Sequence, residues 1–132
     1  MAGIPLNTFR SVRKVVPSAS ILMQVPPAPL NNTNTYFFYQ APQGVTSIVI
    51  MMQVSNIDPT STAVHAVTLW HWQYRTQQFT TLIRNYQIPS QDAASLVTGK
   101  LVLETGDQLY IASTTTGTYL QMLTSIIETA NQ

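Results

Sequence analysis

The chain has 132 residues, of which 8 % are charged and 45 % hydrophobic; none is cysteine, and the formal net charge is +1. These values exclude disulfides and thiolate chemistry, and they argue against nucleic acid or an anionic membrane as a partner. Because charged residues make up about 25 % of a typical chain and subunit interfaces are depleted of charge, the composition favours a protein that assembles with others, with a neutral Thr-rich β-domain as the alternative.

Residues 1–34 differ from the rest and are predicted to form an extended arm. Five of the eight prolines lie in the first thirty residues, and proline interrupts helices and central strands. Short strands are expected there only near Val12–Val16 and Ser20–Val25. We expect the arm to bind a neighbouring subunit through three cationic and five apolar side chains, namely Ile4, Leu6, Phe9, Arg10, Arg13, Lys14, Ile21 and Leu22.

Residues 35–132 are predicted to form one all-β domain, a β-sandwich or jelly roll of about eight strands. Strand-like segments recur about every 8–12 residues and are separated by turn clusters such as Asn56–Thr60 and Pro89–Asp92. The expected strands are Thr35–Gln40, Thr46–Ser55, Ala63–Gln73, Phe79–Tyr86, Ala94–Val97, Leu101–Glu104, Gln108–Ser113 and Tyr119–Thr129.

Alternation within these strands predicts which side chains face the core. In Thr46–Ser55, the even-numbered residues from Ile48 to Val54 are expected on one face, although Val49 and Met51 make the opposite face apolar as well. In the closing strand one face carries three apolar side chains, Leu120, Met122 and Ile126.

The sequence offers few groups for catalysis or metal binding. His65 and His71 lie on one expected strand, but six residues at about 3.3 Å each place them roughly 20 Å apart, too far for one metal ion. The five acids include turn positions such as Asp58 and Asp107, and no calcium loop or Gly-rich phosphate loop is present. We therefore expect no enzymatic activity, no catalytic or metal-binding residues and no cofactor.

Three aromatic residues alternate along one strand, Trp70, Trp72 and Tyr74. They could form an exposed surface that binds sugars or a partner protein. They could also pack in the core or between subunits, which is the usual role of such a stripe in a sandwich and the interpretation we favour.

Several strand-and-turn signatures follow one another in a fixed order. They are Tyr39–Ile50 (YQAPQGVTSIVI), Val54–Asp58 (VSNID), Ile88-Pro89, Gly99–Asp107 (GKLVLETGD) and Ser125–Glu128 (SIIE). This order resembles a group of small virion proteins of tailed bacteriophages, common in phages of cyanobacteria and other marine bacteria. The resemblance covers about residues 36–128 and rests on order and spacing. It implies a β-sandwich with a structural role in the virion and no catalytic residues.

We therefore expect a non-enzymatic virion structural protein, assembled in the host cytoplasm. Within the particle the leading hypothesis is a capsid cement or decoration protein that contacts copies of itself, for example in a trimer, and other virion proteins such as the major capsid protein. A neck, tail, baseplate or fibre-associated protein is the alternative. A carbohydrate-binding or adhesin module is the alternative of another class, and a small cell-wall hydrolase comes third. Neither nucleic acid nor a membrane is an expected partner.

Overall fold

The computed structural model describes residues 7–17, 36–97, 99–113 and 119–130. All regular elements in these ranges are β-strands, which confirms the all-β prediction. In chain order they are β1 (Asn7–Val15), β2 (Phe37–Gln40), β3 (Val45–Asn56), β4 (His65–Gln73), β5 (Gln78–Ile88), β6 (Asp92–Ser95), β7 (Leu101–Leu103), β8 (Gln108–Ser113) and β9 (Leu120–Ala130).

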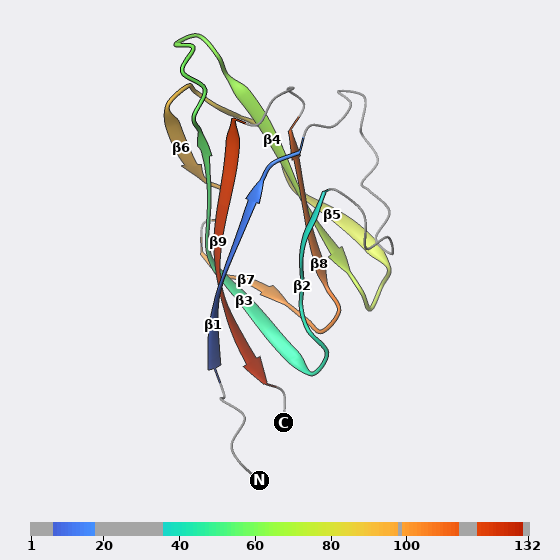
Figure 1. Ribbon diagram of the computed structural model, residues 1–132. Helices are drawn as coiled ribbons and strands as arrows, with labels where there is room; N and C mark the ends of the chain where they lie inside the picture. Colours follow the sequence, from blue (N-terminus) through green and yellow to red (C-terminus); the bar gives the residue numbers. More distant parts are fainter. Residues whose placement is uncertain (1–6, 18–35, 98, 114–118, 131–132) are drawn as a thin grey trace.

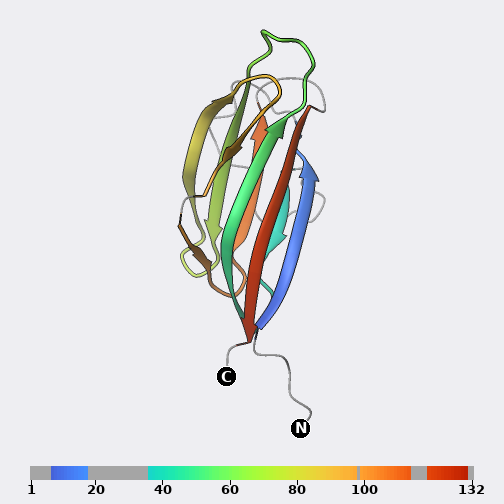
Figure 2. The same ribbon diagram turned by 90° about the vertical axis from the view of Figure 1, so that its left-hand side faces the viewer.

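The strands form two antiparallel sheets that pack face to face as a β-sandwich (Figures 1 and 2). The five-stranded sheet has the order β1-β9-β3-β6, and β7 pairs with β3 beside this path. The four-stranded sheet has the order β2-β8-β4-β5. Strands that follow one another in the sequence often lie in different sheets. In the five-stranded sheet, β9 lies between β1 and β3 although it is the last strand of the sequence.

The main core lies between the sheets and follows from alternation in each strand. The predicted inward face of β9 is confirmed, because Leu120, Met122 and Ile126 are all buried. Each large aliphatic side chain removed from water contributes about 1.5–3 kcal/mol to folding. The largest fully buried aliphatic side chains in this core are Met52, Leu69, Ile88, Leu103, Leu109, Ile111 and Ile126.

A β-bulge in β3 changes which residues face the core. The pairing of β3 with β9 shifts between Val49 and Met51, so Ile50 is the extra residue. An extra residue exchanges the two faces of a strand, because side chains alternate with a period of two. Ser47 and Val49 are therefore buried before the bulge, and Met52 and Val54 after it. The prediction that Ile48 and Ile50 face the core is wrong for this reason.

Part of the predicted arm belongs to the sandwich. Asn7–Val15 pairs with β9 along its whole length, and the Val16 amide donates to the Leu120 carbonyl oxygen. The boundary expected at residue 34 is therefore wrong for β1, which is an edge strand of the five-stranded sheet. The arm was predicted from the many prolines of the first thirty residues, but residues 7–15 contain none and can form a regular strand. The second expected arm strand, Ser20–Val25, lies outside the described residues.

Candidate interaction surface

The outer face of the five-stranded sheet is the candidate functional surface. Figure 2 shows β1, β9 and β3 side by side, with no described segment crossing in front of them. Directly opposite residues in antiparallel strands point to the same face, so the register assigns each outward side chain. The outward positions are the odd-numbered residues of β1 and β9 and, in β3, Thr46 and Ile48 before the bulge, and Met51, Gln53 and Ser55 after it.

An apolar row crosses this face. Phe9 of β1 lies opposite Ile127 of β9, which lies opposite Ile48 of β3, which in turn lies opposite Val102 of β7. Phe9 is 75 % exposed and Val102 53 %, while the two isoleucines between them are half-buried. A sheet face in contact with water normally carries polar side chains, so four adjacent apolar residues indicate a contact surface.

Charge is nearly missing from the same face. Among the outward residues of β1, β9 and β3, Arg13 carries the sole charge, and the others are apolar or neutral polar. Leu123 adds further exposed apolar area on this face, two cross-strand rows away from the apolar row, and the bulge residue Ile50 is also exposed. Apolar side chains with few charges are typical of the centre of a protein–protein interface.

A polar cluster on the inner side of the five-stranded sheet connects the two sheets. The Tyr39 hydroxyl donates its proton to Glu128 of β9. It also lies 2.7 Å from the Ser47 hydroxyl of β3. Because the Tyr39 proton is already used, the Ser47 hydroxyl is the donor in this second bond. Arg10 Nη1 lies 3.3 Å from the same Glu128 carboxylate. Burial and the neighbouring Glu128 together raise the pKa of Tyr39 far above its ordinary value of 10.0. Tyr39 is therefore a neutral donor that connects β2 in one sheet to β3 and β9 in the other.

The predicted arm residues have different places in the fold. Phe9 and Arg13 point outward from β1, as a partner-binding role requires. Arg10 instead pairs with Glu128 of its own chain, and its expected role in binding a neighbouring subunit stays a prediction. Lys14 lies beside Arg13 and lines a surface groove with it. The remaining residues named for the arm, Ile4, Leu6, Ile21 and Leu22, lie outside the described residues.

The aromatic stripe does not form an exposed platform. Trp70 and Trp72 point away from the main core, on the outer side of the four-stranded sheet, yet they are only 3 % and 1 % exposed. They pack with Tyr110, whose pKa burial raises to about 12, and with Phe79, whose ring centroid lies 6.5 Å from that of Trp72. Both tryptophans are thus packed, which is the interpretation we favoured, and of the possible surface formed by Trp70, Trp72 and Tyr74 only Tyr74 is half-exposed.

Each histidine is held by an aspartate, a pairing that the sequence analysis missed. His65 Nε2 lies 2.9 Å from Asp58 Oδ2, and His71 Nε2 lies 3.0 Å from Asp107 Oδ2. The signal for such pairs was the placement of both histidines on an inward strand face, where a buried polar ring needs a partner. With five acids in the chain, the choice of partner was small.

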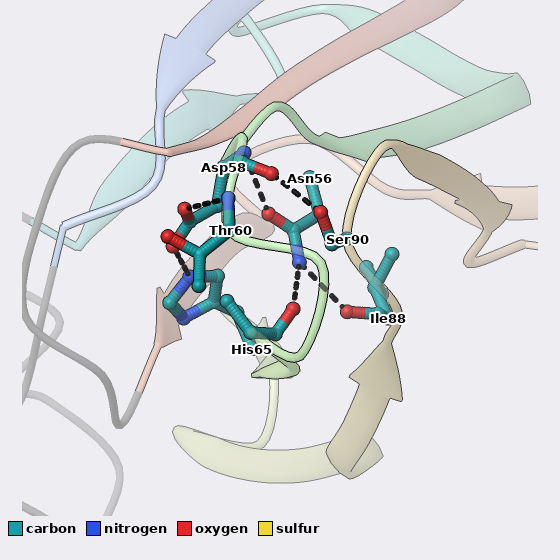
Figure 3. Close-up of polar contacts among 7 residues, drawn as sticks. Asn56, Asp58, Thr60, His65, Ile88 and Ser90 are labelled. Atoms are coloured by element: carbon teal, nitrogen blue, oxygen red, sulfur yellow. Dashed lines mark hydrogen bonds and ion pairs between the residues drawn. The ribbon is translucent and has the colours of Figure 1, made fainter.

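The Asp58–His65 pair belongs to a network that fixes loops (Figure 3). Asp58 Oδ1 accepts from the Thr60 amide, and this bond and the His65 contact lower the pKa of Asp58 below 3.8. Buried Asn56 donates to the Ile88 carbonyl oxygen at 2.8 Å and accepts from the Asp58 amide. The Ser90 hydroxyl donates to the Asp58 main-chain oxygen. The arrangement stabilises the turns that these residues occupy.

His71 and Asp107 have a similar structural role at the other end of β4. Asp107 accepts from the amides of Tyr74 and Glu104, which holds the turns after β4 and β7 together. No group of three potential metal-binding side chains occurs in residues 7–17, 36–97, 99–113 or 119–130.

Comparison of this chain with family models and with curated proteins gave no match. Within the described ranges, no helix is long and apolar enough to cross a membrane.

Proposed function

We propose that this protein is a non-enzymatic structural component of a tailed-bacteriophage virion that binds neighbouring subunits through the outer face of its five-stranded sheet. The apolar row of Phe9, Ile127, Ile48 and Val102 is the observation that carries the proposal. The virion setting comes from the resemblance to small phage proteins over residues 36–128. Within the particle we propose a cement or decoration role on the capsid.

The energetics favour a covered surface over a bare one. Transfer of apolar area from water contributes about 25 cal/mol per Å², so burial of Phe9 and Val102 alone amounts to a few kcal/mol. Both side chains stand on a paired sheet, so little ordering entropy opposes their burial. A rigid sandwich with an uncharged, partly apolar face suits a protein that stabilises a larger assembly.

The buried polar groups also fit a non-enzymatic role. Asp58 and Asp107 use their oxygens to hold main-chain amides and a histidine ring. A general acid or base needs a side chain that faces a substrate-sized cavity, and these carboxylates face turns of their own chain. The tryptophans that a sugar-binding module would expose are buried.

The test is incorporation of variants into particles. Phe9→Ser combined with Val102→Thr removes apolar area at both ends of the row. The matched control combines Tyr86→Ser with Val64→Thr, at two half-exposed apolar residues outside the row. Tagged variants are expressed in the infected host, and their copy number is measured by mass spectrometry of purified virions.

We expect the row variant to fold normally and to incorporate at least about tenfold less than the control, since 1.4 kcal/mol of lost contact energy corresponds to a factor of ten. Particles without the protein are expected to lose their genome at lower temperature, as the cement role requires. Failure to find the wild-type chain in purified virions refutes the virion proposal. Equal incorporation of both variants refutes the role of the apolar row.

A further inference from the structure

One edge of β1 has no partner strand in the part of the chain that the structure describes. β1 is terminal in the order β1-β9-β3-β6, so only its other edge is paired, with β9. Figure 2 shows no described segment beyond β1 in this sheet. The register with β9 runs through all nine residues without a bulge, and residues 7–15 contain no proline. A long, regular edge of this kind can accept another strand.

The other edge strands of the described sandwich are short or irregular. β2 and β6 have four residues each, and the pairing of β2 with β8 contains a register shift. β5 is long, but its pairing with β4 shifts at two places. Short strands and bulges protect sheet edges from association, and β1 has neither protection. The contrast indicates that the edge of β1 is used for a contact.

The pairing with β9 shows which main-chain groups lie at the open edge. The Val16 amide donates to the Leu120 carbonyl oxygen, and bonded pairs alternate with non-bonded pairs in an antiparallel ladder. The even-numbered residues of β1 therefore bond to β9, and the odd-numbered residues direct their amides and carbonyl oxygens to the open edge. These odd-numbered residues are Asn7, Phe9, Ser11, Arg13 and Val15.

We propose that two copies of this chain associate through this edge, with β1 of one copy antiparallel to β1 of the other about a two-fold axis at Ser11. The inference goes beyond the proposed function, because it assigns a contact at the edge of the sheet instead of on its face. The contact joins two five-stranded sheets into one continuous sheet. It pairs every main-chain group that the odd-numbered residues direct to the edge.

Charge complementarity supports the axis at Ser11. Strand β1 carries three cations, and like charges directly opposite one another oppose strand pairing. With this axis, each cation lies opposite an uncharged residue of the second copy. The opposite pairs are Arg13 and Phe9, Arg10 and Val12, and Lys14 and Thr8.

Neighbouring positions of the axis are less favourable. An axis at Arg10 places that arginine opposite its own copy, and an axis at Val12 places Arg10 opposite Lys14. An axis at Phe9 avoids like charges but pairs a shorter stretch of β1. Charge and length therefore both favour Ser11.

The contact also provides a partner for Phe9. Its side chain is 75 % exposed on the outer face, and Arg13 of the second copy lies directly opposite it. A guanidinium beside an aromatic ring is attracted by the ring quadrupole, and the two-fold axis makes this contact twice. On the inner side, a groove of about 470 Å³ follows the edge between residues 10–13 of β1 and β2. The groove leaves space for the side chains that the second copy directs inward.

The first test is the oligomeric state of the full-length protein, measured by sedimentation equilibrium from about 1 μM to about 1 mM. We expect a monomer–dimer equilibrium with a Kd of about 10–100 μM, because a contact through one strand is small. A chain that stays monomeric at about 1 mM overturns the inference. A trimer also overturns it, because a two-fold edge contact closes with two copies.

A single cysteine tests the position of the axis, because the chain contains none. Ser11→Cys places two thiols opposite each other, with Cα atoms about 5.5 Å apart, which suits a disulfide. Ser125→Cys is the matched control, because Ser125 lies opposite Ser11 on β9 and on the same face. Its two copies lie three strand spacings apart, about 14 Å, which is too far for a disulfide.

Mild oxidation should therefore link the Ser11→Cys chains into covalent dimers and leave the Ser125→Cys chains unlinked. Equal cross-linking of the two variants overturns the inference, because it indicates association through the sheet face. A dimeric sample in which Ser11→Cys does not cross-link overturns it as well.

Phe9→Arg and Tyr86→Arg test the charge argument. Each variant replaces an exposed aromatic side chain with a cation, but Tyr86 lies on β5 in the other sheet. Phe9→Arg places arginines opposite Arg13 twice and should raise the Kd at least about tenfold. Tyr86→Arg should change it by less than about twofold. Equal effects of the two variants overturn the inference. None of these measurements uses virions, so this inference and the proposed function fail separately.

Discussion

Removal of the Tyr39 hydroxyl should weaken the connection between the two sheets. Tyr39 is 4 % exposed, and its hydroxyl is bonded to Glu128 and to the buried Ser47. A hydrogen bond to a charged group contributes about 1.5–3 kcal/mol, and a buried hydroxyl left without a partner adds a further cost. Glu128 retains Arg10, which offsets part of the loss. We expect Tyr39→Phe to lower the free energy of unfolding by about 2 kcal/mol.

Urea denaturation followed by tryptophan fluorescence measures this change. For a chain of this size, 2 kcal/mol corresponds to a fall in Tm of about 6–10 °C. Tyr86→Phe is the control, because Tyr86 is half-exposed, and we expect it to change stability by less than about 0.5 kcal/mol. A double-mutant cycle with Glu128→Gln isolates the pair. The reasoning is refuted if Tyr39→Phe matches the control, or if its cost is the same with and without the Glu128 carboxylate.

Two further predictions concern turns. Gly44 and Gly106 both have positive φ, but a Cβ at Gly106 would lie 2.8 Å from Tyr74 Cγ, whereas one at Gly44 meets nothing within 4 Å. Gly44→Ala should therefore cost about 1–2 kcal/mol and Gly106→Ala about 2–4 kcal/mol by denaturant titration, and equal costs would contradict the Tyr74 contact. Because the pKa of Asp58 is lowered, its contribution to stability is present above pH 3.8 and is lost as the pH falls through the lower folded-state value. Asp58→Asn should be less stable at pH 7 and lose less stability on acidification, as urea midpoints between about pH 2 and pH 7 will show; parallel curves for both proteins would contradict this.

Local sequence patterns were sufficient to predict most strands. Gln108–Ser113 was predicted with the bounds that β8 has, and Gly106 in the turn before it has a positive φ of 85°. Alternation and β-branched residues are local signals, so they are readable from one sequence. The inward face of β9 followed from the same signal.

Features that depend on pairing between distant strands could not be predicted. The bulge at Ile50 appears only when β3 is matched with β9, and it reverses the assignment of Ile48. Arg10 finds Glu128 at a separation of 118 residues, so no local pattern indicates that β1 belongs to the sheet. The candidate surface was partly readable, because Phe9 and Arg13 were named, but its continuation through Ile127 and Val102 required the register.

The position of β9 has a consequence for how the protein is made. β9 alone connects β1 to β3, whose other side pairs with β6 and β7, and β9 is the last of the nine described strands to leave the ribosome. The sheet therefore cannot close during translation of the earlier strands, and non-local closure of this kind is slow. Until then, the unpaired main-chain groups of β1 and of the β9 side of β3 are open to pairing with other chains. A nascent chain stalled before residue 120 should thus be a substrate for chaperones, and a late frameshift should produce aggregates instead of a shortened sandwich.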